Sequence, residues 1–367
     1  MKFLLISPKN RTVYNFRGDL IKSIIASGYE VIVTGPDQTD VEKIEALGVR
    51  FVELPMNKTG TSISGDLKYR KALTALMKAE KPDVTLGYTI KPVVYGAMAA
   101  HAAGVKNING MITGGGYTFT AKTVKAKVLG LIVRPLYRLG LGMTDHVIFQ
   151  NEDDMTEFVS RGLVKREKCQ VVNGSGVNMD RFQPAPFPAQ PTFFMLSRLL
   201  KSKGVLEYLE AARIVKAEFP NARFGLLGKY ETSMQDAIPQ ETVEAYIRDG
   251  IVERFEETSD VRPYYADCSV YVLPSYREGT PRTVLEAMAM GRPILTTNTN
   301  GCRSTVKDGV NGFLIPVGNS NALAEKMKTF LRMPALAVKM GAESTRLCRE
   351  KFEVGKVNQE MLRIMQL

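Results

Sequence analysis

The chain has 367 residues, of which 44% are hydrophobic and 24% charged, so it can build two ordinary globular cores and is too apolar to be intrinsically disordered. Lysine and arginine outnumber aspartate and glutamate by 49 to 38. The net charge of +11 indicates a polyanionic or membrane-surface partner, although an ordinary basic soluble enzyme would fit as well.

Neither secretion nor membrane insertion is expected. The segment from Met1 to Asn10 has too short an apolar stretch for a signal peptide, and the chain lacks the run of about eighteen apolar residues that a transmembrane helix needs. The four cysteines form no C-x-x-C pair, which fits a reducing compartment and favours neither a zinc site nor a disulfide framework. We therefore expect a cytoplasmic protein that meets a membrane only from its surface.

The first half alternates short apolar runs with segments of helical spacing. This βαβ alternation predicts a parallel sheet flanked by helices. The expected strands are Phe3–Ile6, Glu30–Thr34, Val49–Leu54, Asp83–Leu86 and Asp145–Phe149. The expected helices are Gly18–Ser27, Leu67–Glu80, Val93–Ala103 and Asp153–Arg161.

The loop Ser7–Gly18 follows the first strand and carries Lys9, Arg11 and Arg17. These cations would suit the diphosphate of an acceptor, although a solvated loop is equally plausible. A second loop follows Asn107 and contains Gly114 and Gly115. These glycines could let the backbone approach a ligand closely, or they could form a simple flexible turn.

The segment Ala121–Leu141 mixes aliphatic residues with five cations and has no acid. A basic amphipathic helix of this kind suits an anionic membrane surface, although a helix packed on its own domain would show the same pattern. Further cations upstream point to the first half as the membrane-facing one: Lys58, Lys68, Arg70 and Lys71.

The segment Gln183–Pro191 has four prolines in nine residues and is the clearest linker in the chain. After it the alternation restarts and predicts a second parallel sheet. The expected strands are Thr192–Ser197, Arg223–Leu227, Val252–Phe255, Tyr265–Ser275 and Pro293–Thr297. The expected helices are Gly204–Glu218 and Asn321–Leu331, followed by helical sequence to Leu367.

Three cations, Arg198, Lys201 and Lys203, precede the helix expected from Gly204. A helix amino terminus disfavours cations unless an anion offsets them, so a diphosphate would suit this site. A solvated basic turn is the plain alternative.

Two glutamates eight positions apart, Glu278 and Glu286, flank a second loop-to-helix junction. Thr280 is expected to cap this helix, Pro281 to lie in its first turn and Gly291 to end it. Free backbone amides can donate hydrogen bonds to sugar hydroxyls, and carboxylates can accept hydrogen bonds from them, so the two together suit a sugar ligand. An ordinary capped helix with one exposed and one salt-bridged glutamate is the alternative.

The run from Glu278 to Glu286 resembles the E-x7-E signature of retaining GT-B glycosyltransferases of the Leloir type, and the resemblance spans essentially the full chain. In that family the first glutamate contacts the donor sugar and the second binds the nucleotide ribose. An R-x4-K pair, matched by Arg198 and Lys203, holds the diphosphate. The resemblance thus implies catalytic roles for Arg198, Lys203 and Glu278, and donor-binding roles for Glu286, Gly279, Thr280, Pro281, Arg282 and Gly228.

By this resemblance the fold is α/β, with two Rossmann-like doubly wound domains facing across a cleft. Residues 1–183 would form the acceptor-binding domain, residues 191–349 the nucleotide-sugar domain, and a helix at about 350–367 would cross back onto the first. Many relatives carry a histidine at the end of an amino-terminal-domain strand, which this chain lacks. Thr113, or the amides at Gly114 and Gly115, could supply that contact to the sugar, and the catalytic base stays open.

Arg282 and the run Asn300–Arg303 look like the subgroup of undecaprenyl-diphosphate-linked N-acetylgalactosaminyltransferases. This implies transfer of a sugar, best an N-acetylhexosamine, from a UDP-sugar to a polyprenyl-diphosphate-linked glycan in bacterial polysaccharide or glycoprotein biosynthesis. The implied enzyme is peripheral on the cytoplasmic face of the inner membrane. Its oligomeric state is open.

No cofactor or metal is expected, because there is no convincing D-x-D and the two histidines, His101 and His146, lie far apart in sequence. Two alternatives remain: a UDP-sugar epimerase on the same fold, and a non-catalytic basic module that binds membrane or nucleic acid. Nucleic acid has no support from a helix-turn-helix signature or an aromatic-interleaved basic patch.

Overall fold

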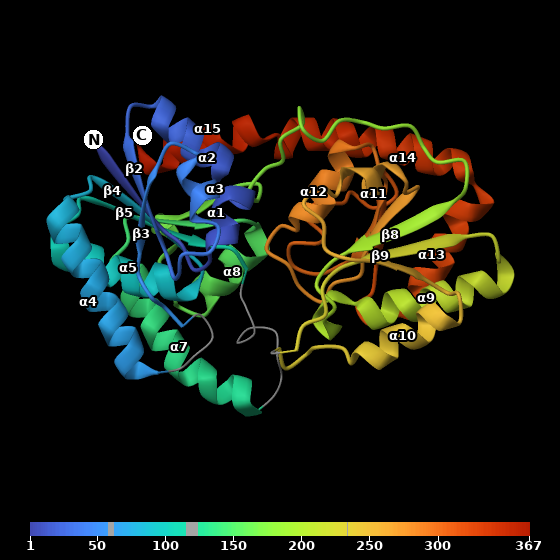
Figure 1. Ribbon diagram of the computed structural model, residues 1–367, viewed down its shortest axis with the longest axis horizontal. Helices are drawn as coiled ribbons and strands as arrows, with labels where there is room; N and C mark the ends of the chain where they lie inside the picture. The colour runs from blue at the N-terminus through green and yellow to red at the C-terminus, as the bar shows by residue number, and fades with distance from the viewer. Residues whose placement is uncertain (58–61, 115–123, 233) are drawn as a thin grey trace. The chain divides into compact units, whose positions relative to one another are not determined.

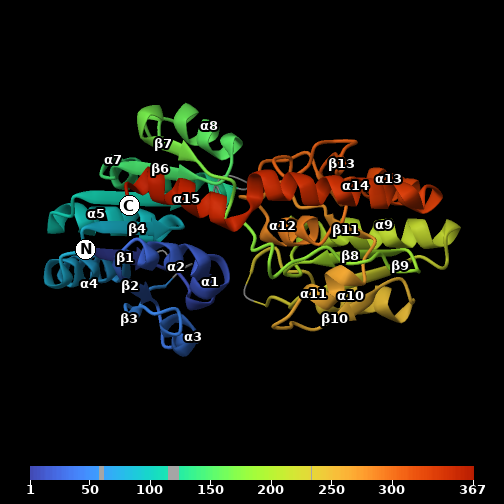
Figure 2. The same ribbon diagram turned by 90° about the horizontal axis from the view of Figure 1, so that it is seen from above.

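The computed structural model describes residues 1–57, 62–114, 124–232 and 234–367. The chain divides into two compact units. In Figure 1 the first is blue to green together with the red helix at the carboxyl terminus, and the second runs from green to red. Unit 1 comprises Met1–Ser175 and Val354–Leu367, and unit 2 comprises Gly176–Glu353. Both ends of the chain therefore lie in unit 1 (Figure 2).

Unit 1 is built on a seven-stranded parallel sheet in the order β3-β2-β1-β4-β5-β6-β7. The order runs outward in both directions from the neighbours β1 and β4, which is the doubly wound arrangement of a Rossmann-like fold. The strands are β1 (Lys2–Ile6), β2 (Glu30–Gly35), β3 (Arg50–Glu53), β4 (Val84–Tyr88), β5 (Asn107–Ile112), β6 (His146–Phe149) and β7 (Cys169–Val171).

Helices cover both faces of this sheet because alternate residues of each strand point to opposite faces. Phe3 and Leu5 of β1 join the core beneath α1, α2, α3 and α15, whereas Leu4 and Ile6 join the core beneath α4 and α5 (Figure 1). The helices of unit 1 are α1 (Asn10–Phe16), α2 (Gly18–Ala26), α3 (Val41–Glu45), α4 (Ile63–Glu80), α5 (Ile90–Ala103), α7 (Val124–Gly142), α8 (Glu152–Ser160) and α15 (Val354–Met365).

Unit 2 repeats the plan with a six-stranded parallel sheet in the order β10-β9-β8-β11-β12-β13. Here the chain order reverses between β8 and β11. The strands are β8 (Thr192–Leu196), β9 (Arg223–Leu227), β10 (Glu253–Phe255), β11 (Val270–Leu273), β12 (Ile294–Thr297) and β13 (Gly312–Ile315). The prediction of two Rossmann-like α/β domains is confirmed.

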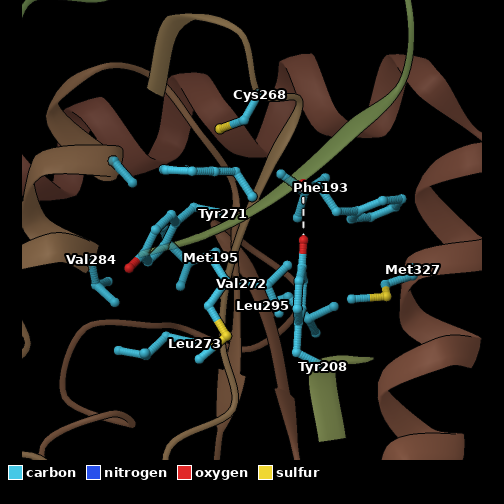
Figure 3. Packing of buried hydrophobic residues seen from close by; sticks show 14 of the residues in the cluster. Phe193, Met195, Tyr208, Cys268, Tyr271, Val272, Leu273, Val284, Leu295 and Met327 are labelled. Atoms are coloured by element: carbon cyan, nitrogen blue, oxygen red, sulfur yellow. Dashed lines mark hydrogen bonds between the residues drawn. The ribbon is translucent and has the colours of Figure 1, made fainter. Parts of the chain in front are cut away.

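Figure 1 shows α11, α12 and α14 on one side of this sheet and α9, α10 and α13 on the other. The core between them is rich in aromatic rings, and Tyr208 is fully buried in it (Figure 3). The core tolerates its hydroxyl because this group bonds to the carbonyl oxygens of Phe193 (3.0 Å) and Gly225 (2.9 Å). The helices of unit 2 are α9 (Val205–Glu218), α10 (Gln240–Arg248), α11 (Arg262–Ala266), α12 (Arg282–Ala289), α13 (Ser320–Arg332) and α14 (Pro334–Leu347).

The strand expected over Tyr265–Ser275 is wrong at its start. Tyr265 lies in the short helix α11, which Pro263 favours in its first turn, and the strand β11 begins only at Val270.

The proline-rich segment Gln183–Pro191 belongs to unit 2, where the buried Arg292 fixes it. Nη2 of Arg292 donates to the carbonyl oxygens of Pro186 (2.8 Å) and Ala266 (3.1 Å), and the guanidinium lies 4.6 Å from the ring centre of Phe187. The polar backbone of this segment is thus tied to α11 of the same unit.

Candidate functional site

Lys203 and Glu278 meet at the carboxyl edge of the unit 2 sheet. Lys203 ends a 3₁₀ turn (Lys201–Lys203) that follows β8, and Glu278 lies in the loop after β11. Since the chain order reverses between these two strands, the pair lies where α/β sheets bind their ligands. Nζ of Lys203 is 2.5 Å from Oε1 of Glu278, and the two side chains are 21% and 14% exposed.

Backbone contacts tie the loops that carry this pair to one another. The amide of Tyr276 and the hydroxyl of Ser275 both donate to the carbonyl oxygen of Ser202, at 2.9 and 3.1 Å. Gly204 has a φ of +75°, and a Cβ there would lie 2.1 Å from the carbonyl oxygen of Pro274. A glycine is therefore needed at this point to let the two loops approach so closely.

The loop after β12 contacts the backbone of Glu278. The amide of Glu278 donates to the carbonyl oxygen of Asn300 at 3.1 Å. Gly301 has a φ of +75°, and a Cβ there would lie 2.1 Å from the carbonyl oxygen of Gly279 and 2.3 Å from that of Glu278. The backbone of the 278–279 segment thus rests directly on Gly301.

Substituting Gly301 with alanine should displace that segment, and Gly309 offers a matched control. Gly309 has nearly the same φ, +74°, but nothing lies within 4 Å of its Cβ position. We expect Gly309→Ala to cost about 1 kcal/mol of unfolding free energy for backbone strain, and Gly301→Ala to cost about 1–3 kcal/mol more for the clash. Urea denaturation measures both, and equal losses would contradict the tight contact.

Glu286 lies inside α12, which begins directly after this loop. Its Oε2 accepts a hydrogen bond from the Tyr265 hydroxyl at 3.0 Å, and its Oε1 lies 3.3 Å from Nε of Arg282, one turn earlier in the helix. The Glu286 side chain is 13% exposed. Burial raises the pKa of this carboxyl, and the Arg282 charge and the Tyr265 hydroxyl act in the opposite direction.

The predicted cap and start of α12 are each wrong by one residue. The capping position falls on Pro281, whose φ of −70° and ψ of 111° are extended, and the helix begins at Arg282. Thr280 is buried just before the cap. The prediction that Gly291 ends the helix is confirmed, since Gly291 follows the last turn with a φ of +78°.

Arg198 and Gly228 complete the set of predicted donor residues. Arg198 follows β8, its side chain is 51% exposed, and its Nη1 lies 3.9 Å from Oε1 of Glu231. Gly228 follows β9, and a Cβ there would lie 1.8 Å from the carbonyl oxygen of Ser197. Gly228 thus allows the ends of β8 and β9 to approach closely.

The carboxyl edge of the unit 2 sheet therefore gathers cations and carboxylates. An ammonium and an exposed guanidinium can bind an anionic diphosphate, while buried carboxylates accept hydrogen bonds from sugar hydroxyls. This combination fits a nucleoside diphosphate sugar. The sequence did not indicate that Tyr265 and Gly301 support the two glutamates, because both contacts depend on the folded sheet.

In unit 1, the expected loop Ser7–Gly18 is largely helical, since α1 covers Asn10–Phe16. Lys9 and Arg11 are exposed, but Arg17 is only 4% exposed. Nη1 of Arg17 donates to the Ser175 hydroxyl at 2.9 Å, and its guanidinium lies 5.1 Å from the ring centre of Tyr88. Arg17 therefore helps to hold Tyr88, and its contact with an acceptor stays a prediction.

Tyr88 ends β4 next to β1, at the point where the chain order of the unit 1 sheet reverses. Its hydroxyl is within 2.7 Å of the Ser7 hydroxyl and 2.8 Å of the Thr12 hydroxyl. Thr89, the next residue, has an unusual φ of +67°. The sequence did not indicate this cluster because Ser7 and Thr12 are about 80 positions from Tyr88 in the chain.

The other predicted residues of unit 1 are only partly described. Thr113 and Gly114 are half-buried beyond the end of β5, and Gly114 has a φ of +132°. Gly115 lies outside the described residues, as do Lys58 and Lys122. In α7, Arg138 donates to the carbonyl oxygens of Gly162 (2.8 Å) and Arg161 (3.3 Å), so it is engaged within its own unit.

Within the described ranges, no helix combines the length and apolar character that spanning a bilayer requires. In the same ranges, no three histidine, cysteine, aspartate or glutamate side chains gather as metal ligands would.

Comparisons with known proteins agree with this geometry. Residues 2–151 match the family model described as glycosyl transferase 4-like, and residues 177–346 match that of the glycosyl transferases group 1. The chain is 26% identical over 345 residues to the N,N'-diacetylbacillosaminyl-diphospho-undecaprenol alpha-1,3-N-acetylgalactosaminyltransferase of Campylobacter jejuni, a match covering 90% of this chain and 89% of that one.

A second curated relative is the UDP-Gal:alpha-D-GlcNAc-diphosphoundecaprenol alpha-1,3-galactosyltransferase of Escherichia coli, which is 26% identical over 74% of this chain and 72% of its own length. Among solved structures, Alr3699/HepE of Anabaena in complex with UDP matches over 100% of both chains with a TM-score of 0.82 at 17% identity. The solved structure shows that the fold is shared from end to end. Since the two family models together account for most of the chain, this chain is a glycosyltransferase with a glycosyl transferase 4-like domain followed by a group 1 domain.

Proposed function

We propose that this enzyme transfers an N-acetylhexosamine from a UDP-sugar to a polyprenyl-diphosphate-linked glycan, with retention of the anomeric configuration, in bacterial polysaccharide or glycoprotein biosynthesis. The observation that carries the proposal is the pairing of Lys203 with Glu278 at 2.5 Å, at the chain-order reversal of the unit 2 sheet. The names of the two curated relatives support the class of acceptor, because both act on sugars linked to undecaprenol through a diphosphate.

In this proposal unit 2 binds the donor. Glu286 accepts hydrogen bonds from the ribose hydroxyls, with Arg282 and Tyr265 orienting its carboxyl group. Lys203 and the exposed Arg198 bind the diphosphate, and Glu278 contacts the hydroxyls of the sugar. Glu278 holds Lys203 in position, so the cation is already in place to bind the diphosphate.

The reaction forms a bond between an acceptor hydroxyl oxygen and the anomeric carbon and breaks the bond from that carbon to the β-phosphate oxygen. UDP leaves with the electron pair, and the two cations stabilise its developing charge. The acceptor hydroxyl attacks the same face of the sugar from which UDP departs. Its proton therefore lies next to a phosphate oxygen, which can accept it. The scheme needs no covalent enzyme intermediate.

The acceptor would bind to unit 1, where the exposed Lys9 and Arg11 follow β1 and where Thr113 and Gly114 follow β5 at the same edge of the sheet. A polyprenyl chain is confined to a bilayer, so the enzyme would work as a peripheral protein on the cytoplasmic face of the inner membrane.

We expect activity without a divalent metal, because Lys203 and Arg198 supply the positive charge that a metal would otherwise bring to the diphosphate. Transfer rates measured with EDTA and with added magnesium should agree. A rate that EDTA abolishes and magnesium restores would contradict this prediction.

The function can be tested by incubating the protein with radiolabelled UDP-N-acetylglucosamine, UDP-N-acetylgalactosamine, UDP-glucose and UDP-galactose, each with extracted undecaprenyl-diphosphate-linked glycans. We expect label from an N-acetylhexosamine donor to enter the organic phase, in a linkage whose proton coupling shows the donor's anomeric configuration. Label that remains water-soluble with every donor would contradict transfer. Isomerisation of a UDP-sugar without acceptor would instead identify an epimerase.

A further inference from the structure

The long helix α4 presents two chemically different faces. Tyr69, Leu73 and Met77, spaced by four residues, are buried in the core that α4 shares with α5 and the sheet of unit 1. Figure 1 shows α4 at the margin of unit 1, next to α5. One stripe of the helix is thus fixed to the domain, and the opposite stripe faces solvent.

The acidic residues of α4 are paired within unit 1. Oδ1 of Asp66 lies 2.5 Å from Nζ of Lys91, and Oδ2 of Asp66 accepts a hydrogen bond from the Tyr95 hydroxyl at 3.0 Å. At the other end of the helix, Oε2 of Glu80 lies 2.6 Å from Nη2 of Arg50 and 3.2 Å from Nζ of Lys2. Both negative charges of the helix are therefore neutralised on its inner side.

The exposed side of α4 is cationic and partly apolar. Lys68, Lys71 and Lys78 are exposed, and so are Ile63 (78%) and Leu67 (47%), two apolar side chains one turn apart. From Ile63 to Glu80, all of which the structure describes, no exposed side chain is acidic. We name this set, Ile63, Leu67, Lys68, Lys71 and Lys78, the α4 outer face.

We propose that the α4 outer face docks the protein on an anionic lipid bilayer. Lysines beside exposed aliphatic side chains are what a helix lying in the membrane interface requires, because the ammonium groups reach the lipid phosphates while the aliphatic side chains enter the acyl boundary. A nucleic acid would use the lysines but would leave Ile63 and Leu67 in water. The inference rests on the proposed function, since it explains how a soluble fold reaches a lipid-linked acceptor.

The position of the helix supports this assignment. The Asp66 contacts fix the first turns of α4 beside Lys91 and Tyr95 in the first turns of α5, and α5 starts at the carboxyl end of β4. Ile63 and Leu67 therefore lie at the edge of the sheet that carries Lys9, Arg11 and Thr113. Docking there would bring a membrane-embedded acceptor close to the proposed acceptor-binding residues.

The competing surface is α7, whose described side chains both pack within unit 1 and reach solvent. Tyr137 is buried with its ring 5.2 Å from that of Phe158, Leu141 is buried, and Arg138 is engaged by two carbonyl oxygens. One stripe of this half of α7 is therefore used for packing, while Arg134 and Leu139 (50%) are exposed. With Arg138 already bonded, this exposed stripe offers fewer available cations than the three exposed lysines of α4.

The test is co-sedimentation with vesicles made of equal parts phosphatidylglycerol and phosphatidylcholine. Each lysine near such a surface strengthens binding about fivefold, so Lys68→Glu/Lys71→Glu/Lys78→Glu should weaken it by at least about a hundredfold at low salt. The matched control, Lys307→Glu/Lys339→Glu/Lys351→Glu, changes the net charge equally with three exposed lysines of unit 2 and should bind as the parent does. Equal losses in the two variants would overturn the proposal, because overall charge would then explain them.

Ile63→Ser/Leu67→Ser tests the apolar part. It should weaken vesicle binding severalfold even at high salt, where screening has removed the contribution of the lysines. Release by Lys122→Glu/Lys125→Glu/Lys127→Glu but not by the α4 variants would place the contact in the segment 122–127 and overturn the proposal. So would binding to duplex DNA as tight as binding to vesicles and equally dependent on the three α4 lysines.

These results can be separated from the proposed function. Both α4 variants should bind UDP as the parent does and should keep full activity on a short-chain, water-soluble acceptor, while losing transfer to acceptor in vesicles. Vesicle binding that depends on α4 in a protein without transferase activity would refute the proposed function alone. Normal transfer with α4 variants that still bind vesicles would refute the docking surface alone.

Discussion

Replacing Lys203 by alanine is expected to lower kcat by about two to three orders of magnitude. The side chain is largely buried at the sheet edge, where Glu278 positions it, and removing one such preorganised group from a site of developing negative charge costs about 10²–10³ in rate. Because Lys203 would contact the diphosphate, UDP should lose affinity in this variant and uridine should not. Steady-state kinetics and calorimetry with both ligands measure these effects.

Lys201→Ala is the matched control for Lys203→Ala. Lys201 lies in the same 3₁₀ turn, two residues earlier, and is exposed. We expect its alanine variant to keep nearly parental activity. Equal losses in the two variants, or equal weakening of UDP and uridine by Lys203→Ala, would show that the turn matters only through its general positive charge.

Glu286→Ala is expected to weaken UDP binding by about 1.5–3 kcal/mol, the usual cost of losing hydrogen bonds to a charged group. Uridine should be weakened as much as UDP, because the lost contact is with the ribose. The free energy of unfolding should change less than the free energy of UDP binding. Burial raises the pKa of Glu286, so burying its ionised carboxylate opposes folding, and the alanine variant removes that cost. Calorimetry and urea denaturation measure the two effects separately.

Glu278→Ala serves as the comparison for Glu286→Ala. The proposed contact of Glu278 is with the transferred sugar, so this variant should bind uridine normally and should lose most of the preference for the UDP-sugar over UDP. If both glutamate variants weaken uridine equally, the two carboxylates do not have the separate roles that we assign to them.

The sequence predicted the fold well because its strands are continuous apolar runs and its helices carry apolar residues at helical spacing. Strands such as Glu30–Gly35 and Arg223–Leu227 agree with the expected bounds within one residue. Three strands were not among those expected: β5, β7 and β13. β13, Gly312–Ile315, starts with a glycine and leaves a run of only three apolar residues. A run this short shows no periodicity that separates a strand from a loop.

The candidate site could be predicted as a set of residues but not as a set of contacts. The spacing of Glu278 and Glu286 is local, so the sequence could indicate that one lies in the loop and the other in the helix. The pairing of Glu278 with Lys203, 75 positions away, depends on β8 and β11 being neighbours. The burial of Arg17 likewise depends on Tyr88 and Ser175, which only the folded sheet brings to it.

The most direct test of the proposed donor site is a crystal structure of the protein with UDP bound. We expect the diphosphate to lie within hydrogen-bonding distance of Lys203 Nζ and the Arg198 guanidinium, and a ribose hydroxyl to bond to the Glu286 carboxylate. UDP bound elsewhere, with Lys203 still paired to Glu278 and Glu286 bonded only to Arg282 and Tyr265, would contradict the assignment of this site.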